Sequence, residues 1–264
     1  MANGSYALVT GASSGLGADF ARELAGRGYD LILVARREDR LRELGAEIER
    51  DRGAQVEIVV ADLALDADRE RVAQSALALS KPVEVLINNA GLGLYGRFNA
   101  IPWPKEKQML DVDVDAVVHL TKLLTPAMVA QGKGYVLNIA STAAYQPTPL
   151  YASYAATKAF ILSFSHALNF EFRGSGVSVT VVSPGITATE FLQVSKQQPT
   201  LYQRLTIMQS KAVVAKALGA LFARRAAVIP GAFNNVMAKS EAMLPNTLKT
   251  RAAYFLMRSN EAVH

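Results

Sequence analysis

The sequence predicts an α/β fold: a doubly wound, Rossmann-like parallel sheet of about seven strands with helices on both faces, in a single domain over residues 1–264. Short apolar runs alternate along the chain with amphipathic stretches of helical period. Parallel strands need long crossovers, so strands separated by helices at this spacing lie parallel in one sheet. The expected strands are Tyr6–Val9, Leu31–Ala35, Val56–Val60, Val83–Ile87, Tyr135–Ile139, Val177–Val182 and Ala227–Ile229.

Composition narrows the class of protein. Half of the 264 residues are hydrophobic and 19% are charged, which suits a globular enzyme and excludes a disordered or fibrous chain. Cysteine is absent, which rules out disulfides and thiolate metal sites, and we expect no metal. The net charge of +5 is spread along the chain without a basic and aromatic run, so we expect no nucleic-acid partner. With no signal peptide or membrane span expected, the predicted location is cytoplasmic.

A glycine-rich turn follows the first strand and reads TGASSGLG from Thr10 to Gly17. Glycine lets the backbone turn tightly and approach a pyrophosphate, which the amino end of the next helix favours through its free N–H groups. The spacing departs from the G-x-G-x-x-G pattern, and the alternative is a plain loop between strand and helix. The turn residues expected to bind a cofactor are Gly11, Ser13, Ser14, Gly15, Leu16 and Gly17.

The second strand ends in Ala35-Arg36-Arg37 and lacks the acidic residue that marks an NAD site at this position. Arg36 can form a bidentate pair with a 2′-phosphate, and Ser13 could add a hydroxyl contact. We therefore expect NADP(H), bound in part by Arg36 and Arg37. The alternative is that both arginines only cap a solvated helix start.

Three further strand ends carry candidate cofactor contacts. Asp62 follows the third strand, where it could lie beside the adenine amino group. The amides after the fourth strand could join strand ends, contact cofactor, or both, and the hydroxyls after Pro184 could hold the nicotinamide carboxamide and the diphosphate. The residues expected to bind are Asp62, Leu63, Asn89, Ala90, Gly91, Pro184, Gly185, Thr187 and Thr189.

The stretch from Ser141 to Lys158 has the character of a proton-transfer site. Tyr154 and Lys158 are one helical turn apart in a run, Tyr151 to Phe172, that reads as a helix. An ordinary tyrosine titrates near about 10, and a neighbouring cation lowers that pKa by stabilising the phenolate. Ser141 follows a predicted strand, at the sheet edge where open α/β sheets bind ligands. The Tyr-x-x-x-Lys spacing alone is a weak motif.

Together these residues resemble the short-chain dehydrogenase/reductase family in its single-domain form. The motifs occur in the family's order: TGxxxGxG from Thr10, NNAG from Asn88, Ser141, Tyr154-x-x-x-Lys158 and Pro184-Gly185. The resemblance implies that Tyr154 is the general acid and base, that Lys158 binds the ribose and lowers the tyrosine pKa, and that Ser141 polarises the substrate oxygen. Both Tyr154 and Lys158 then also contact cofactor.

The resemblance implies a fourth catalytic residue, an asparagine that holds a water in a proton relay. At that position this chain has Asp113. A carboxylate cannot donate the hydrogen bonds of an amide, which puts the relay in question. We expect the relay to survive, because much of the role is attributed to the backbone carbonyl.

The resemblance implies NADP(H)-dependent interconversion of a hydrophobic ketone or 3-oxoacyl compound and its secondary alcohol. A bulky apolar substrate suits the apolar residues expected around the site. The alternative is a non-catalytic dinucleotide-binding regulator on the same fold. The expected apolar rim comprises Leu92, Leu94, Tyr95, Phe98, Tyr145, Pro147, Leu150, Phe191 and Leu192.

The rest of the chain is expected to form a substrate lid, at about 186–210, and a helical extension, at about 232–264. Pro245 would interrupt a long helix and start a shorter one at Asn246. Residues 239–258 mix apolar and basic side chains as interfacial helices do, so a membrane-surface or assembly role is an alternative to packing on the body or on a neighbouring subunit. Family resemblance implies a homodimer or homotetramer formed through long helices at about Lys105–Val129 and Tyr151–Phe172.

Overall fold

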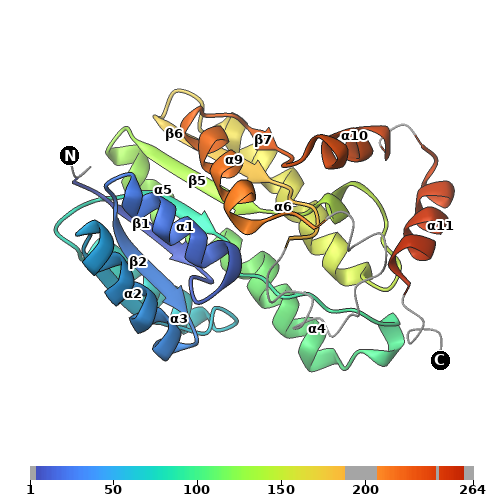
Figure 1. The fold of residues 1–264 in the computed structure, drawn as a ribbon, viewed down its shortest axis with the longest axis horizontal. Helices are drawn as coiled ribbons and strands as arrows, with labels where there is room; N and C mark the ends of the chain where they lie inside the picture. Colours follow the sequence, from blue (N-terminus) through green and yellow to red (C-terminus); the bar gives the residue numbers. More distant parts are fainter. Residues whose placement is uncertain (1–3, 188–206, 242–243, 259–264) are drawn as a thin grey trace.

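The computed structural model describes residues 4–187, 207–241 and 244–258, and a seven-stranded parallel sheet runs through its centre (Figure 1). The strand order is β3-β2-β1-β4-β5-β6-β7. The seven predicted strands are confirmed, with each end within one residue of the prediction. Their bounds are β1 (Tyr6–Thr10), β2 (Asp30–Ala35), β3 (Val56–Val60), β4 (Val83–Asn88), β5 (Gly134–Ile139), β6 (Val177–Val182) and β7 (Ala227–Val228).

Helices connect the strands, as parallel pairing requires. Two short 3₁₀ turns, η1 (Phe98–Ala100) and η3 (Thr142–Tyr145), and one π-helical turn, η2 (Asp111–Asp115), complete the elements described. The α-helices are α1 (Gly15–Gly26), α2 (Glu38–Arg52), α3 (Asp66–Leu77), α4 (Trp103–Leu110), α5 (Ala116–Ala130), α6 (Ala152–Glu171), α9 (Ser210–Phe222), α10 (Ala232–Glu241) and α11 (Asn246–Met257). None of these helices combines the length and the apolar character that crossing a bilayer requires.

The core has two layers, one on each face of the sheet. Side chains alternate along a strand: in β1, Ala7 and Val9 join the cluster under α1, α2 and α9, while Tyr6 and Leu8 join the cluster under α3 and α5. The prediction of helices on both faces is therefore confirmed. The strand order reverses between β1 and β4, which places a ligand crevice at the carboxyl ends of these strands.

A buried chain of amides and hydroxyls ties the sheet to the helices behind the crevice. The Asn88 Nδ2 group donates to Asn138 Oδ1 at 2.9 Å and to Thr121 Oγ1 at 3.1 Å, and the Asn138 Nδ2 group donates to Ser165 Oγ at 2.9 Å. These bonds join α5, β4, β5 and α6. Because a buried polar group without a partner is costly, they hold the four elements in a single relative position.

The expected long helix at Lys105–Val129 is interrupted. The chain runs from α4 into the π turn η2 and only then into α5. A π turn inserts an extra residue into the helical ladder, and such turns occur often at functional sites. Here it contains Asp113, whose side chain is fully buried. The other long helix, expected at Tyr151–Phe172, is present as α6.

The C-terminal helices lie at the end of the molecule opposite the N-terminus (Figure 1). The start of α11 at Asn246 confirms the prediction drawn from Pro245, which is its N-cap residue. Ala253 is buried, and the Tyr95 hydroxyl donates to the Met257 carbonyl oxygen at 3.2 Å. One side of α11 therefore packs on the loop that follows β4.

Candidate active site

A cavity of about 460 Å³ opens at the carboxyl ends of the strands. It is walled by the glycine turn, by the loops after β2, β3, β4, β5 and β6, and by α6, α10 and α11. Most residues singled out from the sequence meet here. Those that line it are Gly11, Ser13, Ser14, Gly15, Leu16, Arg36, Arg37, Asp62, Leu63, Asn89, Ala90, Gly91, Ser141, Tyr154, Lys158, Pro184, Gly185 and Thr187.

Two of the predicted site residues are placed differently, and a third lies outside the described residues. Gly17 lies behind the glycine turn, in contact with the turn's own backbone, and Asp113 lies behind Lys158. Neither is part of the cavity wall. Thr189 falls outside the described residues, as does most of the segment expected to form a lid.

The glycine turn is shaped so that only small residues fit. Gly11 has a φ of +66°, in the left-handed region, and a Cβ there would lie 2.9 Å from the Ala90 Cα. A Cβ on Gly17 would overlap the Gly11 carbonyl oxygen. The close packing brings the amino end of α1 to the cavity, where free N–H groups and the helix dipole favour an anion. This cradle fits the pyrophosphate of a dinucleotide.

Hydrogen bonds join the ends of β1 and β4 beneath the cradle. The Thr10 hydroxyl oxygen accepts from the backbone N–H groups of Asn89 and Ala90, at 2.9 and 3.0 Å. The Asn89 side chain donates to the Thr10 carbonyl oxygen at 2.9 Å. Asn89 therefore joins the strand ends and also faces the cavity.

The two arginines after β2 are exposed at the cavity edge. The Arg37 Nη2 group donates to Ser13 Oγ at 3.1 Å and to Ser14 Oγ at 2.8 Å. Sequence reasoning centred this subsite on Arg36, whereas the structure places the Arg37 guanidinium against both serines. Two cations and two hydroxyls at one edge suit a phosphate group.

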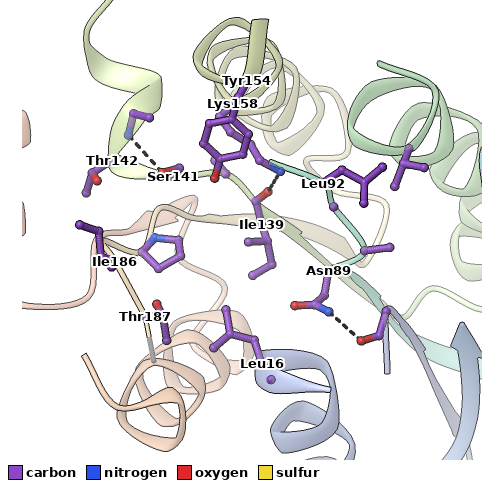
Figure 2. A pocket seen from close by; sticks show the side chains of 18 of the residues that line it. Leu16, Asn89, Leu92, Ile139, Ser141, Thr142, Tyr154, Lys158, Ile186 and Thr187 are labelled. Atoms are coloured by element: carbon purple, nitrogen blue, oxygen red, sulfur yellow. Dashed lines mark hydrogen bonds between the residues drawn. The ribbon is translucent and has the colours of Figure 1, made fainter. Parts of the chain in front are cut away.

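Ser141, Tyr154 and Lys158 lie together on the wall formed by η3 and α6 (Figure 2). The Ser141 side chain caps η3 by accepting from the Ala143 backbone at 3.1 Å, and it is also a hydrogen-bond partner of Tyr154. The Lys158 Nζ atom is 5.5 Å from the centroid of the Tyr154 ring and donates to the Ile139 carbonyl oxygen at 3.4 Å. The cavity therefore has a phenol, a hydroxyl and an ammonium on one wall.

Asp113 forms a buried ion pair with Lys158. The Asp113 Oδ2 atom is 3.0 Å from Lys158 Nζ, and the exposed fractions of the two side chains are 0% and 7%. The other carboxylate oxygen accepts from the Leu92 backbone N–H at 2.7 Å. A Cβ on Gly91 would lie 3.3 Å from the ammonium nitrogen, so this glycine leaves room for the pair.

The Asp113–Lys158 ion pair affects the pKa values of Lys158 and Tyr154. Burial alone would lower the pKa of Lys158, but Asp113, with Tyr154, raises it above its ordinary value. Burial raises the pKa of Tyr154 and Asp113 adds to that rise, while Lys158 and the Ser141 hydroxyl oppose it; the result lies above the ordinary value. Lys158 lowers the pKa of Tyr154, as expected, but burial and Asp113 raise it by more.

The far wall of the cavity comes from segments that sequence reasoning did not assign to the site. Val112 and Tyr151 face it from the body, and Met237, Ala238 and Met257 face it from α10 and α11. Asn234 also lines the cavity and donates to the Pro230 carbonyl oxygen at 3.1 Å. No local pattern marks these residues, because only tertiary packing brings the C-terminal helices to the sheet edge.

The apolar rim expected from the sequence is largely wrong. Of its described members, Leu92 lines the cavity. Tyr95 packs against Tyr151 with ring centroids 5.1 Å apart, one layer behind the wall, and Phe98 is 69% exposed. Sequence reasoning located the loops correctly but could not tell which of their side chains turn inward. The remaining members outside the wall are Leu94, Tyr145, Pro147 and Leu150, and Phe191 and Leu192 fall outside the described residues.

Comparisons with known proteins agree with the fold. The sequence profile described as short chain dehydrogenase matches residues 5–200. A solved short-chain dehydrogenase from Sphingobium yanoikuyae, in complex with NADPH, is 34% identical and superposes with a TM-score of 0.83, covering 90% of this chain and 92% of the other.

Two curated relatives have named activities. The very-long-chain 3-oxoacyl-CoA reductase of Anas platyrhynchos is 34% identical over 215 residues, or 77% of this chain and 68% of the relative. The 17-beta-hydroxysteroid dehydrogenase type 3 of Mus musculus is 33% identical over 183 residues, or 69% of this chain and 59% of the relative. The matched region is thus about three fifths to two thirds of the length of these relatives.

The ion pair leads to a prediction about stability. Asp113→Ala leaves the Lys158 ammonium buried without its counter-charge and should lower the free energy of unfolding by about 3–5 kcal/mol. Asp113→Asn, which keeps an acceptor for the Leu92 N–H group, should lower it less. Urea unfolding of the protein without added ligand measures both.

The matched control is Asp115→Ala, an exposed aspartate in the same π turn. Surface substitutions of this kind usually change stability by less than about 0.5 kcal/mol. Equal effects of Asp113→Ala and Asp115→Ala would contradict the ion pair.

Proposed function

The chain belongs to the short-chain dehydrogenase/reductase family, and from that premise we propose that it is an NADP(H)-dependent oxidoreductase that interconverts a hydrophobic ketone or 3-oxoacyl compound and its secondary alcohol. One observation carries the proposal. A glycine cradle suited to a pyrophosphate and a wall carrying Ser141, Tyr154 and Lys158 share a single cavity. A dinucleotide held by the cradle would extend along the strand ends toward that wall.

The chain's own residues account for the proton transfer. A bound nicotinamide dinucleotide supplies the hydride in reduction and accepts it in oxidation. In reduction the Tyr154 hydroxyl donates its proton to the carbonyl oxygen of the substrate, and the Ser141 hydroxyl donates a hydrogen bond to the same oxygen. The Lys158 ammonium stabilises the phenolate that remains, and in oxidation the same groups act in reverse.

A preference for NADP(H) is supported by the chemistry of the β2 end. Arg36 and Arg37 stand there with the hydroxyls of Ser13 and Ser14, and the strand itself ends at Ala35 where an NAD site would carry a carboxylate. The serines already accept hydrogen bonds from Arg37. Their hydroxyls and the Arg37 guanidinium are therefore close together, and Arg36 lines the same cavity beside them, which supports binding of a 2′-phosphate.

An apolar substrate is supported by the far wall of the cavity. Met237 and Met257 are unbranched and polarisable, and such side chains adapt to irregular apolar surfaces. The relatives named as a very-long-chain 3-oxoacyl-CoA reductase and a hydroxysteroid dehydrogenase carry names of compounds with a large apolar part, a long acyl chain and a steroid. We assign the substrate class on these two grounds.

A non-catalytic dinucleotide-binding regulator is the alternative, and the Asp113–Lys158 pair is the observation that favours it. A lysine held by a carboxylate is less available to stabilise a phenolate. A screen of apolar ketones and acyl thioesters with NADPH, read at the cofactor's absorbance, separates the two functions. Turnover of any of these compounds contradicts the regulator, and its absence across the whole screen contradicts the enzyme.

The arginines predict cofactor choice. Charge-assisted hydrogen bonds contribute about 1.5–3 kcal/mol, so NADPH should bind at least about tenfold more tightly than NADH. Arg36→Ala and Arg37→Ala should each remove most of that margin and leave NADH affinity nearly unchanged. Calorimetric titration measures both affinities.

Arg42→Ala is the control for this prediction. Arg42 is an exposed arginine of α2 that pairs with Glu38 at 2.6 Å and is not part of the cavity wall. Its replacement should leave the margin intact. Equal affinities of the unmodified protein for NADPH and NADH would disprove the assignment.

Tyr154→Phe tests the proton donor. The substitution keeps the ring and removes the hydroxyl, so turnover should fall by about 10²–10⁴ while NADPH affinity stays close to that of the unmodified protein. Tyr145→Phe is the matched control, since the Tyr145 hydroxyl lies 3.4 Å from Ser183 Oγ and outside the cavity wall. Lys158→Ala should reduce both turnover and binding. Near-normal turnover by the Tyr154→Phe protein would require another donor.

Asp113→Asn tests the effect of the carboxylate on Tyr154. Because Asp113 raises the pKa of Tyr154, its neutral replacement should lower that pKa. The phenolate needed for alcohol oxidation would then form at lower pH. The rise of the oxidation rate with pH, measured at saturating NADP⁺, should shift to lower pH in an enzyme that remains active.

The control for the pH profile is Asp115→Asn, which removes an exposed charge from the same turn. Its profile should superimpose on that of the unmodified protein. A shift of the Asp113→Asn profile to higher pH would show that the carboxylate acts with the opposite sign.

A further inference from the structure

Helix α11 exposes an apolar stripe that the proposed chemistry does not use. Leu248, Ala252, Phe255 and Leu256 fall at positions i, i+4, i+7 and i+8, which places them on one face of the helix. Leu248, Phe255 and Leu256 are 53%, 61% and 36% exposed. In a helix of a globular protein such a stripe normally faces the core, but here it faces solvent.

Cations flank the stripe on both sides. Helical spacing places Arg251 and Arg258 along one edge and Lys249 along the other. The Arg258 guanidinium carbon lies 4.7 Å from the centroid of the Phe255 ring. Residues 246–258 contain no aspartate or glutamate, and within the described part of the chain none of the three cations forms a salt bridge.

The opposite face of α11 is already occupied. Ala253 is buried, Met257 lines the cavity, and the Met257 carbonyl oxygen accepts from Tyr95. The apolar stripe is therefore on the outer side of a helix whose inner side forms part of the cavity wall. The preceding helix α10, at the same end of the molecule (Figure 1), also exposes large apolar side chains, Phe233 at 55% and Val236 at 67%.

We propose that the outer face of α11 docks on the surface of an anionic lipid bilayer. An apolar stripe with cations along its edges matches the boundary between acyl chains and anionic headgroups, where the stripe is buried and the cations stay with the phosphates. The sequence favoured a helix packed on the body or on a neighbouring subunit. The structure shows that packing for the inner face alone.

A second copy of the chain is the competing occupant, and charge argues against it. A twofold interface places the same patch of each subunit against itself. Arg251 and Arg258 of one copy would then approach the same positive helix of the other, with no carboxylate on either α11 to neutralise them. Like charges brought together in this way are destabilising, whereas anionic lipid neutralises them.

Docking in this orientation would bring the α11 side of the cavity next to the bilayer. The inference does not rest on the proposed reaction, since it follows from the surface of α11 alone. Binding to lipid and turnover of a ketone can therefore succeed or fail separately.

Sedimentation with vesicles tests the proposal on the full chain. The protein should bind vesicles of phosphatidylcholine mixed with phosphatidylserine and should bind pure phosphatidylcholine vesicles much more weakly. Each basic residue near an anionic surface contributes on the order of fivefold in affinity, so Arg251→Glu should weaken binding by at least about fivefold. Phe255→Ser removes the largest side chain of the stripe and should weaken it about tenfold.

Phe170→Ser is a closely matched control. Phe170 is 63% exposed and has the Arg173 guanidinium carbon 4.3 Å from its ring centroid, so it reproduces the Phe255–Arg258 arrangement on α6. Vesicle binding should be unchanged in this variant. Thermal unfolding midpoints close to that of the unmodified protein show that all three variants are folded.

Three outcomes would overturn the proposal. The first is absence of binding to the anionic vesicles, or equal binding to both kinds of vesicle. The second is equal loss of binding in Phe255→Ser and Phe170→Ser. The third is the finding, by analytical ultracentrifugation, that the unmodified protein is a dimer and the Phe255→Ser variant is a monomer. A second copy of the chain would then be the occupant of the stripe.

Discussion

The buried ion pair between Asp113 and Lys158 is the constraint on which the site depends. Removing two charges from water is costly, and the cost is offset only when their geometry is good and their remaining hydrogen-bonding capacity is satisfied. The Leu92 N–H group satisfies one carboxylate oxygen, and the Ile139 carbonyl accepts from the ammonium. The pair therefore requires the β4 loop, the π turn η2, the end of β5 and helix α6 to meet at one point, and it fixes the wall that carries Tyr154.

The same pair shapes what Tyr154 can do. A lone ammonium beside a phenol favours the phenolate, but Lys158 and Asp113 together present a nearly neutral pair, and burial then keeps the Tyr154 pKa above its ordinary value. A tyrosine that keeps its proton is a donor, as the reduction of a carbonyl requires. In the proposed reaction, oxidation would need the phenolate and would be opposed by the Asp113 carboxylate. An asparagine at position 113 would leave the charge of Lys158 uncompensated. The Tyr154 pKa would then be lower, and the phenolate required for oxidation would form more readily.

The sequence predicts the sheet well and the contacts within the site less well, for physical reasons. Strands such as Leu31–Ala35 are recognisable because their burial on both faces gives an uninterrupted apolar run, and the site residues after each strand follow from the rule that strand ends converge. The π turn at Asp111–Asp115 has no glycine or proline to signal it, and the packing of Asp113 against Lys158 decides it. Whether Arg36 or Arg37 contacts Ser13 depends on the rotation of the chain at the start of α2, and helical or strand period does not encode that rotation.

The two halves of the cavity are held in place to different degrees. The glycine cradle and the catalytic wall belong to the sheet edge, where strand ends are joined by hydrogen bonds such as those between Thr10 and Asn89. The far wall includes α11, in which Ala253 is the one buried residue among those described and whose Met257 carbonyl oxygen accepts a hydrogen bond from Tyr95. Elements with few buried contacts open at low free energy. In the proposed function, the wall that carries Tyr154 is thus the rigid part of the cavity. The α11 side, which would meet the rest of the substrate, is the part most easily displaced, and this would let one chemistry act on substrates of different bulk.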